Sequence, residues 1–206
     1  MRYAETGFNL EVDLTRGNIE RVATDPRLVE LHLGGLGTNA KILWDRVPPE
    51  VGPFDPENLL IFGTGLLVGT PAPGCNRTIV SCVSPQTRLF AFSMMGGFWG
   101  PELKHAGYDK VVISNKSPKW IYLWIHNDKV ELRDAAHLAG MGATATAEQI
   151  RAELDQPDAQ VAAIGLAGEN RVFFASGPRS VSERWASTVV SNPSTPSRAR
   201  TSAGWG

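Results

Sequence analysis

The sequence is dominated by short segments in which apolar and polar residues alternate. The first segment, residues 8–14, alternates Phe, Leu, Val and Leu with Asn, Glu and Asp. A period of two is typical of a strand with one buried face. The Arg16-Gly17-Asn18 turn leads into residues 19–23, which we expect to form the hairpin partner. The sequence therefore predicts a fold built on β-sheet.

Further strands and a few short helices are expected along the chain. The segment 120–125 is apolar on both faces, which predicts a strand that is covered on both sides. Asp25 and Thr146 are typical N-cap residues, Thr146 within a capping box. The expected strands are residues 59–63, 78–83, 88–93, 108–114, 120–125, 129–133, 160–164 and 171–175, and the expected helices are 26–33, 38–45, 101–106 and 146–154. The fold class is therefore α+β, with sheet predominating.

Three glycine-rich loops interrupt these elements. The motif Gly34-Gly35-Leu36-Gly37 lacks the spacing of a dinucleotide-binding loop, and taken alone it is better explained by a helix C-cap with a turn. The loop between Gly69 and Gly74 leads to Arg77, whose planar guanidinium suits phosphate. Gly96-Gly97 precedes a predicted helix N-terminus, where exposed N–H groups favour an anion. A phosphate-bearing ligand resting on these loops is one interpretation of the pattern.

Composition and charge exclude several function classes. The 20 Lys and Arg residues balance 21 Asp and Glu residues, so we expect no nucleic-acid partner. The longest apolar stretch, residues 59–70, is interrupted by glycine and is too short to cross a membrane. Acidic residues occupy the N-terminus where a signal peptide would be apolar, so we expect a cytoplasmic protein without membrane association.

No catalytic residue and no metal ligand is assigned to this chain. Its two cysteines, Cys75 and Cys82, are seven positions apart, without a Cys-x-x-Cys motif or a flanking histidine. That spacing does not predict a zinc or iron–sulfur site. The four histidines show no ligand spacing, and no nucleophilic triad is evident.

The composition changes abruptly at Ser176. Residues 176–206 hold eight Ser and four Arg, and they contain no Leu, Ile, Phe, Tyr or Met. Such a segment buries too little apolar area to offset the entropy lost on ordering. We therefore predict a domain over residues 1–175 and a disordered or non-native Ser/Arg/Pro-rich tail over 176–206, with a basic, phosphorylatable tail as the alternative.

Taken in order, the motifs of the chain resemble those of a known family. Over about residues 3–175 the sequence is similar to the N-terminal domain of the tungsten-containing aldehyde ferredoxin oxidoreductases. The matching motifs are Gly34-Gly35-Leu36-Gly37, Val47-Pro48-Pro49, Pro56-Glu57-Asn58, Gly69-Thr70-Pro71-Ala72-Pro73, Gly96-Gly97-Phe98-Trp99-Gly100-Pro101-Glu102-Leu103-Lys104, Ala106-Gly107-Tyr108-Asp109 and Gly165 to Asn170. Within the family, residues 39–45 and 93–99 look most like the tungsten subunit of class II benzoyl-CoA reductase.

The resemblance implies a fold and a cofactor. Family members have two β-sheets with short helices, and these sheets form the base for a tungsten bis-pterin (tungstopterin) beside a [4Fe-4S] cluster. Residues 1–175 would then be the tungstopterin-binding domain of an oxidoreductase similar to benzoyl-CoA reductase, with aldehyde oxidation as the alternative activity. The implied partners are ferredoxin or other electron-transfer subunits and a small-molecule substrate, either an acyl-CoA or an aldehyde.

Four residues match cofactor-binding positions of the family. Arg77 corresponds to an arginine between pterin and cluster, where its guanidinium would bind the pterin and tune the cluster. Gly96, with Gly97 beside it, corresponds to a glycine that contacts the pterin. Met94 stands where aldehyde-oxidising members often carry an asparagine for a magnesium site. A thioether does not replace an amide oxygen for a hard cation, which favours the benzoyl-CoA branch.

Two family features are missing from the sequence. The four cluster cysteines belong to later domains, and the Arg/Gly-rich pterin loop should follow soon after Ala175. We hypothesise that a frameshift or truncation near Ser176 made the chain a partial family member. The resemblance therefore leaves open whether the chain is an enzyme, and a catalytically inactive fragment or interaction module is the alternative of another class.

Overall fold

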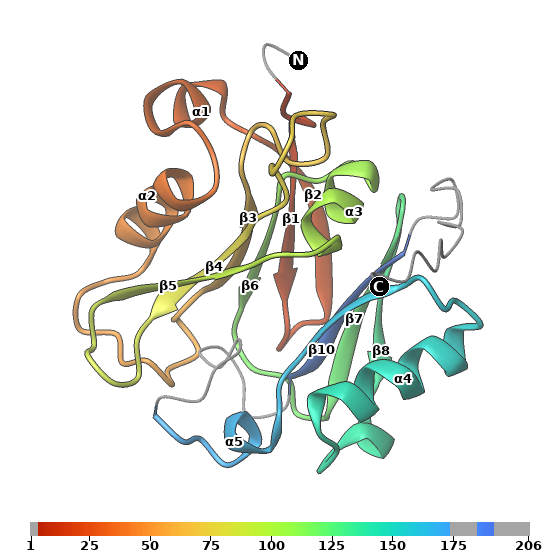
Figure 1. The fold of residues 1–206 in the computed structure, drawn as a ribbon. Coiled ribbons are helices and arrows are strands. Elements are labelled where there is room, and N and C mark those ends of the chain that lie inside the picture. Colours follow the sequence, from red (N-terminus) through yellow and green to blue (C-terminus); the bar gives the residue numbers. More distant parts are fainter. Residues whose placement is uncertain (1–3, 174–184, 192–206) are drawn as a thin grey trace, which may run out of the picture.

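The computed structural model describes residues 4–173 and 185–191, which form two β-sheets with short helices (Figure 1). This arrangement confirms the predicted α+β class. The six-stranded sheet has the order β2-β1-β6-β3-β4-β5, and the four-stranded sheet has the order β8-β7-β10-β9. The strands are β1 (Phe8–Asp13), β2 (Asn18–Ala23), β3 (Leu60–Thr64), β4 (Thr78–Val83), β5 (Phe90–Met95), β6 (Lys110–Ser114), β7 (Ile121–His126), β8 (Lys129–Asp134), β9 (Gln160–Ala163) and β10 (Trp185–Ser191).

The main hydrophobic core lies between the two sheets. Leu10, Phe62 and Val111 reach it from the six-stranded sheet, and Leu123 and Ile125 reach it from the four-stranded sheet. Helix α3 (Trp99–His105) contributes further side chains to this core, and its Trp99 ring lies 5.1 Å from the Phe62 ring. Burial of this inter-sheet surface is therefore what joins the two sheets.

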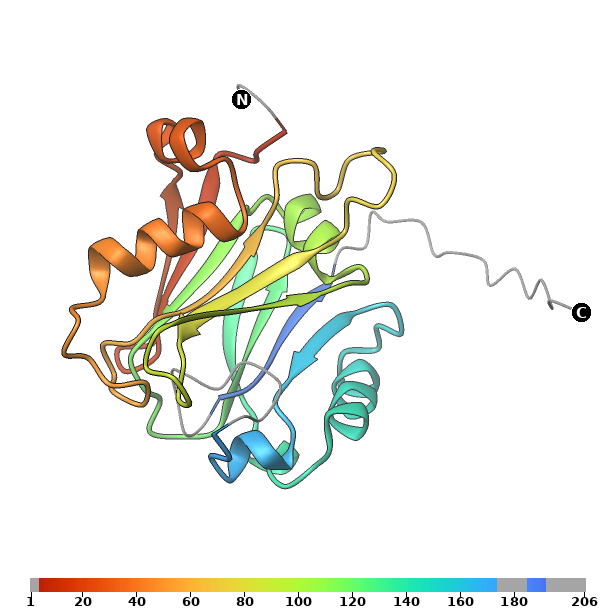
Figure 2. The same cartoon turned by 60° about the vertical axis from the view of Figure 1, so that its left-hand side comes forward.

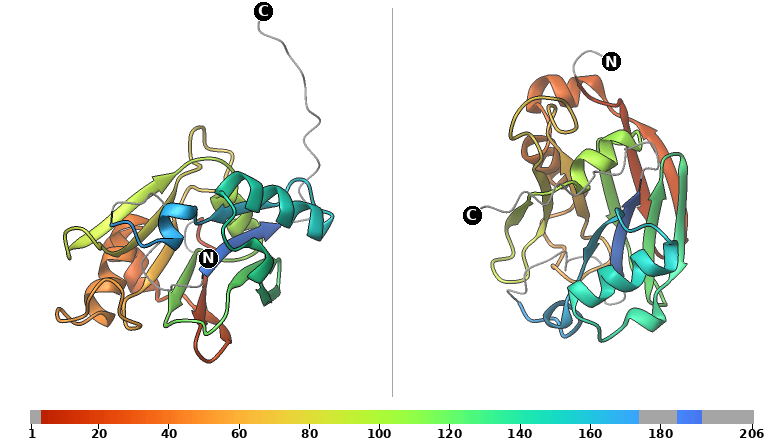
Figure 3. Two further views of the ribbon diagram at one scale, coloured as in Figure 1. Left: turned by 90° about the horizontal axis from the view of Figure 1, so that it is seen from below. Right: turned by 45° about the vertical axis from the view of Figure 1, so that its right-hand side comes forward.

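Helices cover the outer faces of the sheets (Figures 2 and 3). On the six-stranded sheet lie α1 (Pro26–His32) and α2 (Leu36–Arg46), where Leu43 packs with Ile61 and Val112. On the four-stranded sheet lies α4 (Ala143–Leu154), whose Ile150 joins Tyr122 and Trp124 of β7. Strand β7 is therefore covered on both faces, as its apolar sequence predicts.

Several helix and strand boundaries differ from the expectations. Helix α4 begins at Ala143, with Gly142 at its N-cap, so the prediction that Thr146 caps the helix is wrong. Thr146 instead lies inside the helix, where its side chain is buried. Helix α2 begins at Leu36, two residues before the predicted start. Position 37 needs glycine, because a Cβ there would come within 2.4 Å of the His32 carbonyl oxygen.

The chain after Ile164 differs most from the sequence-based expectation. Leu166–Glu169 form a short helix, α5, and residues 171–173 form no strand, whereas residues 174 and 175 lie outside the described residues. Strand β10 lies within the segment for which we predicted disorder, and it pairs in parallel with β7 and antiparallel with β9. Its run of Thr188, Val189 and Val190 suits a strand, and averaging composition over the whole tail obscured it. Within the described residues, no helix is long and apolar enough to cross a membrane.

Truncation of Leu103 tests the inter-sheet core. Its side chain is fully buried there, so Leu103→Ala should lower the free energy of unfolding by about 2–5 kcal/mol. Leu31→Ala is the matched control, because Leu31 is 63% exposed on α1 and its truncation should change stability little. Urea unfolding of both variants measures the difference, and equal losses would contradict the assignment of the core.

Candidate functional site

Glycine-rich loops meet at one end of the six-stranded sheet. The Gly35 N–H donates to the Thr64 carbonyl oxygen at the end of β3 (2.9 Å). A Cβ at Gly35 would lie 3.3 Å from Ile79 of β4, and one at Gly34 would lie 3.2 Å from the backbone of Leu66. Small residues are therefore what allow the first glycine loop to lie against the ends of β3 and β4.

Helix α3 joins the other two loops to this end of the sheet. A Cβ at Gly100 would come within 2.5 Å of the Thr78 hydroxyl oxygen, so glycine is needed where α3 crosses the start of β4. Gly69, with φ +81°, lies in the loop before β4, and a Cβ there would be 3.1 Å from the Lys104 Cβ. The loop before β4 and the start of β4 are thus packed against α3, and the loop after β5 leads directly into this helix.

The register of β4 and β5 places two of the predicted site residues beside each other. Thr78 pairs with Met95, so Arg77 just before β4 stands next to Gly96 just after β5. Arg77, Gly96 and Gly97 are all exposed. Gly97 has φ +91°, a conformation that side chains disfavour, which explains the second glycine of the pair.

Met94 extends this surface along β5. It pairs with Ile79, and its side chain is 55% exposed. Phe90 and Phe92 share its face of the strand, with exposed fractions of 43% and 50%. The predicted residues Arg77, Met94, Gly96 and Gly97 therefore form one continuous surface, apolar along β5 and cationic at Arg77.

This surface fits a flat, anionic cofactor. A Cβ at Gly96 or Gly97 would meet no atom within 4 Å, so the peptide planes there are open to a ligand. Among the described residues, Arg77 makes no hydrogen bond or ion pair, so its guanidinium donors are available to phosphate. These features suit a pterin with its phosphate, with backbone at Gly96-Gly97 and the guanidinium of Arg77 as the contacts.

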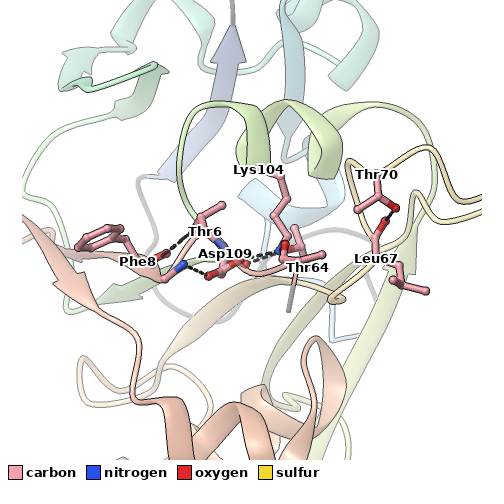
Figure 4. Close-up of polar contacts among 9 residues, drawn as sticks. Thr6, Phe8, Thr64, Leu67, Thr70, Lys104 and Asp109 are labelled. Carbon is pink, nitrogen blue, oxygen red and sulfur yellow. Dashed lines mark hydrogen bonds and ion pairs between the residues drawn. The ribbon is translucent and has the colours of Figure 1, made fainter. Parts of the chain in front are cut away.

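A buried ion pair holds α3 in place beneath the loops (Figure 4). The Lys104 Nζ donates to the Asp109 carboxylate at 2.6 Å and to the Ala4 carbonyl oxygen at 3.0 Å. The same carboxylate accepts the backbone N–H groups of Thr6 and Gly7, each at 3.0 Å. The Lys104 and Asp109 side chains are only 5% and 6% exposed, so water does not replace these contacts.

Asp109 also fixes the end of β3. Its carbonyl oxygen accepts from the backbone N–H of Thr64 at 3.0 Å and from the Thr64 hydroxyl at 2.8 Å. Burial by itself raises the pKa of the Asp109 carboxyl, but the hydrogen bonds from Lys104 and the two backbone N–H groups outweigh it. The pKa is therefore lowered, and the group stays ionised.

Sequence reasoning missed the role of this pair. Lys104 and Asp109 each lie in a motif quoted for the resemblance, but their side chains were given no function. Their separation of five residues, across the Gly107 that follows α3, was the available signal. Cys75 and Cys82 are both half-buried, and they form no disulfide within the described residues. Among the described residues, no three His, Cys, Asp or Glu side chains cluster to hold a metal ion.

Removal of the Lys104 ammonium should destabilise the fold strongly. Lys104→Met leaves the Asp109 carboxylate buried without its cation, and such changes cost about 3–5 kcal/mol. Lys41→Met is the control, because Lys41 pairs with Asp45 on the exposed surface of α2, where a pair contributes about 0.3–0.5 kcal/mol. Chemical denaturation of the two variants gives the comparison, and a loss at Lys104 no larger than at Lys41 would contradict this role.

The lowered pKa of Asp109 predicts a pH dependence of stability. Its stabilising contribution is full above the unfolded-state pKa of about 3.9 and is lost as the pH falls through the lower folded-state pKa. The gap in unfolding free energy between wild type and Asp109→Asn should therefore be largest near neutral pH and shrink in acid. Urea titrations at a series of pH values measure the gap, and one that widens in acid would refute the assignment.

Comparison with known proteins shows the family of the chain. Residues 9–188 match the family "Aldehyde ferredoxin oxidoreductase, N-terminal domain". The match extends beyond the predicted boundary at residue 175 and takes in part of β10. The tungsten-containing aldehyde ferredoxin oxidoreductase of Pyrococcus abyssi is 40% identical over 170 residues, which are 82% of this chain and 28% of that protein. The corresponding protein of Pyrococcus furiosus is 38% identical over 174 residues, which are 84% of this chain and 29% of that protein.

A solved structure is similar in both sequence and fold. It is the active site complex BamBC of benzoyl coenzyme A reductase in complex with 1,5-dienoyl-CoA, with 66% identity and a TM-score of 0.88. The match covers 92% of this chain and 31% of that chain. The sequence thus spans about three-tenths of the length of the relatives that it matches. On the family match, the sequence identity and the shared fold, the chain belongs to the aldehyde ferredoxin oxidoreductase family.

Proposed function

We propose that this chain supplies the pterin-binding floor of a tungsten-dependent oxidoreductase that acts like benzoyl-CoA reductase. The observation that carries the proposal is the pairing of Thr78 with Met95, which places Arg77, just before β4, next to Gly96, just after β5, beside open backbone at Gly97. The relatives are named as tungsten-containing enzymes, and this supports tungsten as the metal. When bound, a tungsten bis-pterin supplies electron transfer at low potential.

The residues of the chain bind and orient this cofactor. Arg77 donates to the pterin phosphate, and the bare peptide planes at Gly96 and Gly97 allow the ring system to approach closely. Met94 provides a thioether in place of a hard-cation ligand, so a magnesium ion would have to rely on backbone or phosphate oxygens. A [4Fe-4S] cluster, if present, needs cysteine ligands other than Cys75 and Cys82, whose separation does not suit it.

The matched proteins suggest two candidate pairs of substrate and partner for this chain. The 66% identity to the BamBC complex, which holds a dienoyl-CoA, favours an acyl-CoA substrate and an additional electron-transfer subunit. Aldehyde oxidation with ferredoxin is the second candidate, and it is supported by the two Pyrococcus relatives. Anaerobic assays of dienoyl-CoA and of aldehyde turnover on the protein that contains this sequence distinguish the two.

Cofactor content tests the proposed site. The protein that contains this sequence, produced anaerobically with tungstate, should carry tungsten and pterin. Arg77→Gln removes a charged contact and Gly96→Val covers the open backbone, so each should lower both contents at least about tenfold. Metal analysis and pterin fluorescence give the readout.

Two controls separate cofactor loss from misfolding. Gly142→Val alters another exposed glycine at which a Cβ meets no atom within 4 Å, and Arg16→Gln removes another exposed arginine. Both should keep full cofactor content. A folded wild-type protein without tungsten or pterin would contradict the proposed function and favour an inactive fragment or interaction module.

A further inference from the structure

A separate cavity lies beyond the C-terminal end of α3. It has a volume of about 350 Å³ and opens between the β1–β2 hairpin and the β7–β8 turn. Its apolar lining includes Leu10, Ile19 and Val130, and its polar lining consists of Arg21, Tyr108 and Asp128. The volume is at the lower end of the range for small-molecule sites, so a metabolite-sized ligand fits and a nucleotide does not.

The polar groups of this cavity have no partners that would occupy them. The Arg21 guanidinium lies over the Phe8 ring, 3.4 Å from its centroid, which fixes the plane of the guanidinium. Within residues 4–173 and 185–191, Arg21, Asp128 and the Tyr108 hydroxyl form no hydrogen bond or ion pair. Tyr108 is only 3% exposed, and it lines the cavity.

The two charges act together on the Tyr108 hydroxyl. Burial raises the pKa of Tyr108, the positive charge of Arg21 opposes that rise, and the negative charge of Asp128 adds to it. Both side chains are therefore electrostatic neighbours of the phenol. At neutral pH the phenol is protonated, so it can donate one hydrogen bond and accept another.

This set of groups is complementary to a ligand with two opposite charges. Arg21 presents a planar pair of donors for a carboxylate, and Asp128 presents a carboxylate for an ammonium group. A ligand with only one charge would form only one of these two charged contacts and would therefore bind more weakly. The apolar lining adds a preference for a hydrocarbon substituent.

We propose that the cavity binds a free α-amino acid with an apolar or aromatic side chain. The carboxylate contacts Arg21, the ammonium group contacts Asp128, the Tyr108 hydroxyl donates to the carboxylate, and the side chain lies on Leu10, Ile19 and Val130. The cavity shares no residue with the surface formed by Arg77, Met94, Gly96 and Gly97. The proposal therefore does not depend on the cofactor that the chain binds.

Three probes of matched shape test the charge requirement. L-Phenylalanine carries both charges, 3-phenylpropionate only the carboxylate and 2-phenylethylamine only the ammonium group. In amide NMR titrations of the 206-residue chain, L-phenylalanine should bind at least about tenfold more tightly than either analogue, with shifts confined to the cavity. Equal affinity for the three probes, or no shift at about 10 mM, would overturn the proposal.

Variants assign each charge to its group. Arg21→Gln should abolish the advantage of L-phenylalanine over 2-phenylethylamine, and Asp128→Asn should abolish its advantage over 3-phenylpropionate. Arg16→Gln, on the same hairpin but outside the cavity, should leave all three affinities unchanged. An advantage that survives both cavity substitutions would show that the charges act elsewhere.

A cavity-filling variant keeps the test independent of charge. Ile19→Trp places an indole in the cavity from a half-buried position on β2, so it should remove binding of L-phenylalanine. The amide spectrum reports whether the variant folds. L-Phenylalanine binding that persists in folded Ile19→Trp would place the ligand outside this cavity and overturn the proposal.

Discussion

The contact between the Lys104 ammonium and the Asp109 carboxylate organises the functional end of the molecule. One carboxylate joins α3 to the N-terminal segment through Lys104, Thr6 and Gly7, while its own backbone holds Thr64 at the end of β3. Since the pair is almost fully buried, its geometry is not weakened by exchange with water. Helix α3 is thereby fixed where the loop before β4 packs against it and where the loop after β5 enters it.

The proposed cofactor floor depends on that fixed helix. With α3 anchored, Gly100 lies against Thr78, and the ends of β4 and β5 bring Arg77 next to Gly96. The backbone of a sheet edge is rigid, so a ligand can be oriented by peptide planes and one guanidinium without a large set of side chains. The Arg21–Tyr108–Asp128 cavity beyond the other end of α3 offers charged side chains instead of open backbone. It suits a small ligand with a negative group for Arg21 and a positive group for Asp128.

Much of the fold could be predicted from the sequence, because alternation and glycine positions report local structure directly. The period-two segment at residues 8–14 predicted β1, and the turn after it predicted β2. The two apolar faces of residues 120–125 correctly indicated that β7 is covered on both sides. The start of α4 and the strand β10 could not be predicted in this way, since packing of a helix face and backbone pairing with β7 and β9 decide them. For the site, the resemblance supplied Arg77, Met94, Gly96 and Gly97, whereas the Lys104–Asp109 pair needed the fold to bring together α3, the N-terminal segment and β3.

The position of tungsten relative to the β4–β5 edge tests the central claim most directly. Anomalous scattering at a tungsten absorption edge, from crystals of the cofactor-loaded protein that contains this sequence, locates the metal without any assumption about the pterin. The account predicts the metal and its pterin over Gly96 and Gly97, with the Arg77 guanidinium in contact with the pterin. Tungsten bound away from this edge, with Arg77 and Gly96 both remote from the cofactor, would contradict it.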